Sequence, residues 1–82
     1  MVQAKTIQEL TPRELEVIGV IATGQSEKQA AALLSIKPVT VHKHIINACE
    51  KTGLNNRTRL LVAWARWQTI QEMSKILLDL SR

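Results

Sequence analysis

Residues 26–53 read SEKQAAALLSIKPVTVHKHIINACEKTG, and this stretch decides the fold because helix start and stop signals follow one another within it. Ser26 is followed three residues later by a glutamine, the capping-box pattern that begins a helix. Pro38 suits the first turn of another helix, where the N–H that proline lacks is not needed. Gly53 suits a helix end, because glycine adopts the left-handed conformation at little cost. The stretch therefore predicts two consecutive helices, over about 27–34 and 38–52.

An earlier helix is expected from the same kind of signal. Thr11, Pro12 and Glu14 supply a hydroxyl cap, a first-turn proline and a capping-box glutamate, and apolar residues at helical spacing follow them. Gly24 is the expected stop, so this helix should span about 12–22.

A fourth helix is expected after Asn55 and Asn56, which are good helix caps. Its apolar series continues almost to the C-terminus, so it should be unusually long. The chain has no Phe or Tyr, only three Gly and two Pro, and no run of alternating β-branched residues, which predicts an all-α fold. We expect one domain over 1–82, with an N-terminal arm over 1–10 and a helical C-terminal extension over 67–82.

The charge of the chain is concentrated in one segment. The net charge of +4 lies entirely within residues 37–59, which hold five basic residues and one acidic residue, while the remainder holds six of each. Such a cluster is typical of a surface that binds a polyanion. The single cysteine excludes an intrachain disulfide, and no apolar run is long enough for a signal peptide or a membrane span. We therefore expect a cytoplasmic protein without membrane contact.

The expected helix over 38–52 has two different faces. Val41, Ile45, Ala48 and Thr52 recur at intervals of 4, 3 and 4 residues, which predicts that they pack inward. The other face mixes cationic, hydrogen-bonding and apolar side chains, a mixture suited to base edges and thymine methyl groups. It consists of Val39, His42, Lys43, Ile46, Asn47 and Glu50.

An ordered set of residues carries a family likeness. It comprises Leu10-Thr11-Pro12-Arg13-Glu14 with Glu16-Val17, Gly24 with Ser26 and Lys28, Thr40-Val41 with His44, and finally Lys51, Gly53, Asn56, Arg57 and Thr58. Through this set, residues 10–66 resemble the DNA-binding domain of the LuxR-type, or GerE-like, transcription regulators. The resemblance implies a four-helix bundle in which helices two and three form a helix-turn-helix, helix three enters the major groove and helix four dimerises.

The sequence departs from the family pattern in and beside the third helix. Lys37 stands where relatives often have a hydroxyl cap, and Pro38 follows it. His42 replaces a lysine that commonly reaches DNA, and Glu50 replaces a residue that is often basic. These departures indicate an unusual target sequence.

Double-stranded DNA is the partner that these features predict, with lysines and arginines on phosphates and the outer face of helix three on bases. His42 is expected either to face DNA or to be a solvated surface side chain, and His44 to make a structural hydrogen bond or a phosphate contact. The predicted DNA-binding residues are Lys28, Lys37, Val39, Thr40, His42, Lys43, Ile46, Asn47, Lys51 and Arg57.

His42, His44 and Cys49 could also suggest a metal site or a catalytic pair. Residues two apart on a helix point in nearly opposite lateral directions, so the histidines cannot easily chelate one ion. A Cys/His pair would lack an orienting third group, and Cys49 is expected to behave as a small buried hydrophobe. We expect no metal, no cofactor and no enzymatic activity.

The apolar stripe of the fourth helix has two interpretations. Its first part can close the small core, whereas beyond Arg66 the intervals of 3, 3, 4 and 3 residues are those of a helix-pairing seam. We expect a homodimer, although the seam could equally bind another regulator. The expected interface comprises Leu60, Trp64, Trp67, Ile70, Met73, Leu77 and Leu80, of which those from Trp67 onward should be exposed in a monomer.

The leading hypothesis is a dimeric, sequence-specific DNA-binding transcriptional regulator that associates with the nucleoid. Only about ten residues precede the first helix, so we expect a free-standing protein without a receiver or ligand-binding domain. The alternative is a protein-interaction module that binds another transcription factor and inhibits or co-activates it, which Glu50 and the missing lysine at position 42 favour. A third reading is a sigma-factor-like promoter contact module.

Overall fold

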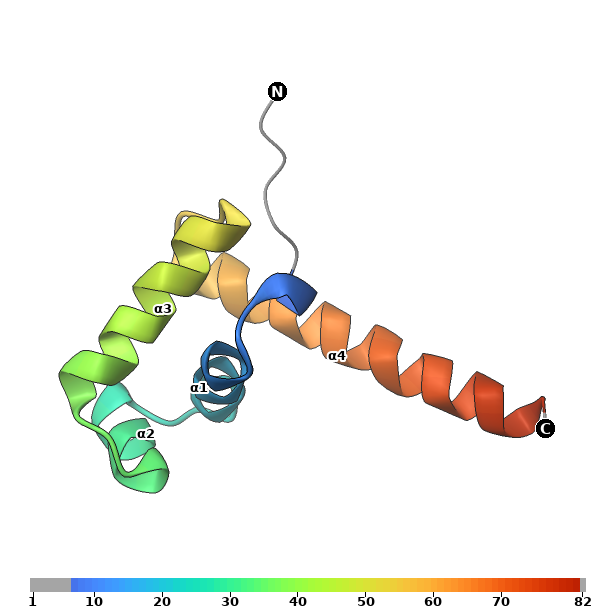
Figure 1. Ribbon diagram of the computed structural model, residues 1–82, viewed down its shortest axis with the longest axis horizontal. Coiled ribbons are helices and arrows are strands. Elements are labelled where there is room, and N and C mark those ends of the chain that lie inside the picture. Colours follow the sequence, from blue (N-terminus) through green and yellow to red (C-terminus); the bar gives the residue numbers. More distant parts are fainter. Residues whose placement is uncertain (1–6, 82) are drawn as a thin grey trace.

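A computed structural model describes residues 7–81, and these residues form a short 3-10 helix and α-helices joined by short turns (Figure 1). No strand occurs within this range, in agreement with the predicted all-α fold. The elements are η1 (Ile7–Glu9), α1 (Pro12–Ala22), α2 (Glu27–Leu34), α3 (Pro38–Thr52) and α4 (Arg57–Leu80).

The helix ends lie where the cap signals predict them. Thr11 and Ser26 each close a complete capping box, with Glu14 and Gln29 as the respective partners. Asn56 caps α4 by accepting a hydrogen bond of 2.8 Å from the backbone N–H of Arg59. Each cap satisfies backbone N–H groups that the first helical turn leaves unpaired, so short local motifs fix the starts of α1, α2 and α4. Lys37 makes no side-chain cap bond, and α3 starts with Pro38 in its first turn.

The turn between α2 and α3 contains a backbone conformation that no sequence signal predicts. Ser35 ends α2 in the left-handed region, with φ of 57°. This conformation is costly for a residue with a Cβ. It reverses the chain so that α3 starts at Pro38, and α2 and α3 then pack against each other as a helix-turn-helix.

The core lies where α1, α2, α3 and the start of α4 meet. Val41, Ile45, Ala48 and Thr52 are all buried, which confirms the predicted inner face of α3. Alanines of α2 at positions 30 and 31 are also buried, and their small size allows α3 to approach closely. The buried apolar residues are Ile7, Leu10, Val17, Ile18, Ile21, Ala30, Ala31, Val41, Ile45, Ala48 and Leu60.

Part of the expected N-terminal arm belongs to the core. Residues 1–6 lie outside the described residues, but Ile7 on η1 and Leu10 are 6% and 4% exposed. No signal in the sequence predicted this contribution to the core. Ile7 and Leu10 thus add to a hydrophobic core that is necessarily small in a chain of 82 residues.

Helix α4 has two halves with different surroundings. Its first half packs against the bundle, and Trp64 lies so close to Gly19 of α1 that a Cβ added there would be 3.3 Å from its ring. Every residue over 71–80 is exposed, and this half projects alone from the bundle (Figure 1). The long fourth helix is therefore confirmed, and its distal half packs against nothing in the described chain.

Two residues of the expected interface are placed differently from the prediction. Leu60 is 1% exposed inside the core, so it cannot lie on an exposed seam. Trp67 packs against the core and is only partly exposed, whereas helix periodicity predicted that it would be exposed in a monomer. Both corrections have the same cause: the bundle, including η1, covers more of the first half of α4 than helix periodicity alone indicates.

Candidate nucleic-acid interface

The outer face of α3 is mostly exposed to solvent. Val39 and Ile46 are 68% and 43% exposed although both are apolar, and His42, Lys43 and Glu50 are exposed beside them. Thr40 and Asn47 are half-buried at the edges of this face. Because the opposite face of α3 is anchored in the core, the outer side chains are held on a rigid element.

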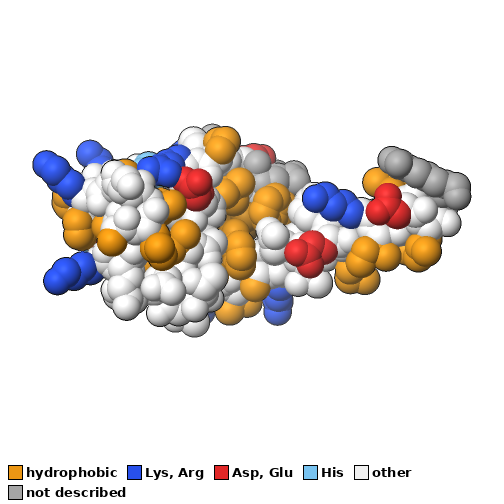
Figure 2. Space-filling model, turned by 90° about the horizontal axis from the view of Figure 1, so that it is seen from below, with side chains coloured by type: hydrophobic (Ala, Val, Ile, Leu, Met, Phe, Trp, Pro, Cys, Tyr) orange, Lys and Arg blue, Asp and Glu red, His pale blue; other side chains and the backbone are white. Residues whose placement is uncertain are grey.

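Lysine side chains lie around this face. Lys28 on α2, Lys37 in the turn and Lys43 on α3 are all exposed. Figure 2 shows Lys and Arg side chains gathered at the end of the molecule opposite the tip of α4. The helix-turn-helix end therefore presents positive charge together with the exposed groups of α3.

Lys51, one of the predicted DNA-binding residues, is engaged within the protein. Its ammonium group donates to both carboxylate oxygens of Glu14, at 2.8 Å and 3.0 Å. Glu14 is 3% exposed, and its burial would by itself raise the pKa of the carboxyl. Hydrogen bonds from Lys51 and from Thr11 outweigh this effect, so the pKa of Glu14 is lowered. The pair joins the end of α3 to the start of α1.

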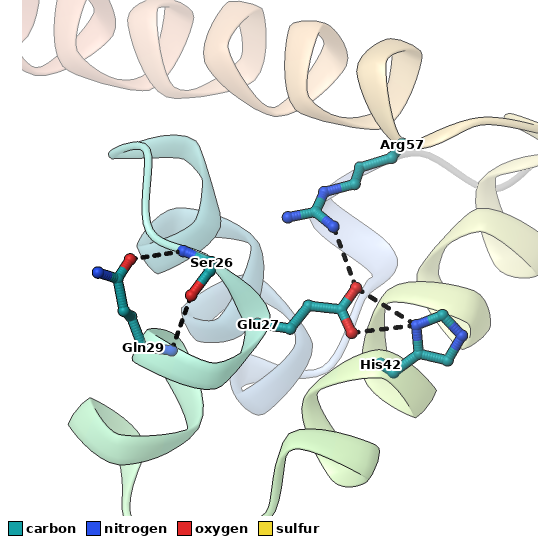
Figure 3. Close-up of polar contacts among 5 residues, drawn as sticks. All are labelled: Ser26, Glu27, Gln29, His42 and Arg57. Carbon is teal, nitrogen blue, oxygen red and sulfur yellow. Dashed lines mark hydrogen bonds and ion pairs between the residues drawn. The ribbon is translucent and has the colours of Figure 1, made fainter.

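A second ion cluster is centred on Glu27, the first residue of α2 (Figure 3). Arg57 at the start of α4 donates to one carboxylate oxygen at 3.0 Å. The Nδ1 atom of His42 lies 3.2 Å and 3.3 Å from the two oxygens. The carboxylate thus brings together two predicted DNA-binding residues from α3 and α4, 15 positions apart in the chain.

Cys49 and His44 lie on α3 away from this cluster. Both are half-buried, and Cys49 packs against the core, as expected for a small apolar side chain. Burial raises the pKa of the Cys49 thiol, which keeps it protonated and weakly nucleophilic. Within residues 7–81 no three His, Cys, Asp or Glu side chains are grouped in a way that could hold a metal ion.

A groove of about 530 Å³ runs along α4, and apolar side chains form most of its wall. Trp67, which lines it, has a buried indole N–H without a hydrogen-bond partner among the described residues. The lining residues are Ile7, Leu54, Thr58, Arg59, Val62, Ala63, Arg66, Trp67 and Ile70.

Local sequence signals could not reveal the partners of Glu14 and Glu27. Glu14 was expected as a capping-box residue, which it is, but its contact with Lys51 spans 37 positions. Glu27 resembles any acidic residue in a first helical turn, where the helix dipole favours it. Only the packing of α1 against α3 and the proximity of α2 to α4 show that two acidic residues from outside 37–59 form ion pairs with basic residues of that segment.

The fold and this surface define a class of protein. Two helices joined by a tight turn, with the second presenting an exposed polar and apolar face beside lysines, make a helix-turn-helix domain of the kind that binds DNA. None of the helices within residues 7–81 has the length and apolar character needed to cross a membrane.

Comparison with known proteins places the chain in a family. A family model described as "Bacterial regulatory proteins, luxR family" matches residues 8–64. The "Transcriptional regulatory protein UhpA" of Escherichia coli (strain K12) is 43% identical over 51 residues, which cover 62% of this chain and 26% of that protein. The "Uncharacterized transcriptional regulatory protein YhcZ" of Bacillus subtilis (strain 168) is 36% identical over 67 residues, covering 82% and 31% respectively.

A third relative shows the same pattern. The "Nitrate/nitrite response regulator protein homolog" of Haemophilus influenzae is 43% identical over 56 residues, covering 68% of this chain and 27% of that protein. The family match spans most of the chain, which therefore belongs to the LuxR family of bacterial regulatory proteins. The resemblance inferred from the sequence is confirmed. The aligned regions span less than a third of the length of these relatives.

Proposed function

We propose that this protein is a sequence-specific DNA-binding transcriptional regulator that inserts α3 into the major groove. The observation that carries the proposal is the contrast between the two faces of α3: one is locked in the core, and the other exposes Val39, Ile46 and Lys43. A rigid helix with a mixed outer face can read base edges without ordering new structure on binding. Its site of action would be the cytoplasm, at the nucleoid.

The outer side chains have complementary tasks in this proposal. Val39 and Ile46 would contact thymine methyl groups, while Lys43 and Asn47 would hydrogen-bond to base edges. Thr40 would help to position α3 at its N-terminal end. Lys28 and Lys37 flank these residues and would neutralise phosphates, which fix the register of the helix on the duplex. His42 and Arg57 instead contact the carboxylate of Glu27, and Lys51 contacts that of Glu14.

We further propose that the protein acts as a homodimer through α4. Met73 and Leu77 continue the groove face beyond Ile70 at helical spacing, and these side chains are 56%, 63% and 59% exposed. A continuous row of apolar side chains exposed to water favours association. The same seam on a second copy can fill the groove beside Trp67, so two copies would cover each other's apolar surface reciprocally.

The experiment pairs solution mass with DNA binding by the 82-residue chain. Lys43→Ala should weaken DNA binding without changing the mass, whereas Lys75→Ala, an exposed lysine on the distal half of α4, should change neither. Leu77→Glu should give a monomer and weaken binding to a two-half-site duplex. Absence of any DNA binding by the wild type at low salt would refute the proposal.

A second candidate function is a module that binds another transcription factor through α4. The exposed distal half of α4 favours it, because an unpaired apolar helix face can dock on a foreign helix as readily as on its own copy. A monomeric wild type without DNA affinity, whose partner binding is lost in Leu77→Glu, would support this candidate in place of the first.

A further inference from the structure

We propose that Glu27 is an internal substitute for a DNA phosphate, which occupies Arg57 and His42 and so limits how strongly this protein holds the DNA backbone. The inference rests on the proposed DNA-binding function, and it names Glu27 as the residue that weakens the electrostatic attraction to DNA phosphates.

The geometry of the cluster is that of a phosphate site. The carboxylate of Glu27 receives a guanidinium N–H from Arg57 at 3.0 Å and meets an imidazole nitrogen of His42 at 3.2 Å. Guanidinium and imidazole groups that converge from two helices on one anionic oxygen pair are equally suited to phosphate oxygens. Figure 3 shows both side chains directed at the same carboxylate.

The location of the cluster makes it accessible to DNA. The side chains of His42 and Arg57 are 57% and 41% exposed, while that of Glu27 is 29% exposed between them. His42 lies one residue from Lys43 on the outer face of α3, so a duplex that reaches this face also reaches the cluster. A phosphate approaching there would meet two basic groups that the carboxylate of Glu27 already contacts.

Acidic residues engage part of the positive charge of segment 37–59. Five basic residues lie in 37–59, and two of them, Lys51 and Arg57, form ion pairs with Glu14 and Glu27 from outside the segment. Glu14 is buried, so its pair is part of the fold. The Glu27 pair is partly exposed, and ion pairs in contact with water are weak enough for a competing anion to displace them.

The test compares Glu27→Gln with the wild type on a short mixed-sequence DNA duplex over a range of salt concentrations. Releasing Arg57 should tighten binding and add about one phosphate contact, which steepens the slope of log affinity against log salt by about 0.9. The affinity advantage of the variant should therefore shrink about threefold to fourfold between about 50 and 200 mM salt. Circular dichroism checks that each variant is folded.

Glu72→Gln is the matched control, because it removes the same charge from an exposed site on the distal half of α4. If it tightens binding as much as Glu27→Gln does, net charge explains the effect and the inference is overturned. In an Arg57→Gln background the gain from Glu27→Gln should largely disappear, and its persistence there would also overturn the inference.

Two further outcomes are decisive. Weaker binding by Glu27→Gln would mean that the carboxylate positions the two side chains for DNA and does not compete with it, which overturns the inference while leaving the proposed function standing. No binding by any variant, even at low salt, would overturn both together.

Discussion

The ammonium group of Lys51 and the buried carboxylate of Glu14 form a hydrogen-bonded ion pair of 2.8 Å that ties the last turn of α3 to the first turn of α1. Glu14 also accepts from the backbone N–H of Thr11 at 2.9 Å, so one side chain serves a helix cap and a contact between helices. Lys51 was expected to bind DNA, but its contact with Glu14 instead helps to fix the orientation of α3.

Acid should destabilise the protein through Glu14. Its pKa is lowered in the folded state, because the hydrogen bonds from Lys51 and Thr11 outweigh the effect of burial. A lowered folded-state pKa gives stability that is present above the unfolded-state pKa and is lost as the pH falls through the folded-state pKa. Urea unfolding at a series of pH values should show this loss below the ordinary range of a glutamate, and Glu14→Gln should remove much of it. A wild type and variant with parallel pH profiles would contradict the assignment.

Lys51→Met should lower the free energy of unfolding by about 1–3 kcal/mol, because it leaves a buried carboxylate without its cation. Lys43→Met is the control, since Lys43 is exposed and makes no ion pair among the described residues. Urea unfolding at neutral pH measures both. Equal stability of the two variants would indicate that Lys51 remains available to DNA.

Leu60→Ala and Leu77→Ala make the same chemical change at two positions of α4. Leu60 is 1% exposed, so its truncation should cost about 2–5 kcal/mol of unfolding free energy. Leu77 is 63% exposed, so its truncation should change the stability of the monomer by less than about 0.5 kcal/mol. Denaturant unfolding at a concentration where the protein is monomeric distinguishes them, and similar losses at both positions would contradict the assignment of Leu60 to the core.

Ser35→Gly should stabilise the protein by up to about 1 kcal/mol, because Ser35 adopts a left-handed conformation that glycine tolerates. Ser35→Val should destabilise it, since a β-branched residue fits this conformation worst. Thermal unfolding reports both shifts. A lower melting temperature for Ser35→Gly would mean that the turn before α3 does not need this conformation.

Salt should weaken DNA binding less steeply than the net charge suggests. With Lys51 and Arg57 paired, Lys28, Lys37 and Lys43 are the free lysines around the outer face of α3, and about three phosphate contacts per subunit predict a slope near 3. The five basic residues of the segment alone would predict a slope of about 4 to 5. Titrations at several salt concentrations decide between these values.

The sequence by itself determined the helices, the inner face of α3 and the family. Caps such as Thr11 with Glu14 and Ser26 with Gln29 act within four residues, and the spacing of Val41, Ile45 and Ala48 reflects the helix period, so local signals sufficed for both. The left-handed turn at Ser35 had no such signal, because serine is not specific for it.

Only the tertiary structure determined which charged and apolar side chains remain available to bind DNA or a partner protein. Glu14 and Glu27 reach cations 37 and 30 positions away, and η1 helps to cover the first half of α4, which places Leu60 in the core and Trp67 at its edge. Contacts over such distances depend on how the helices cross and not on any local pattern. The periodicity of apolar residues indicates which face of a helix is apolar, whereas packing between helices determines how much of that face remains exposed.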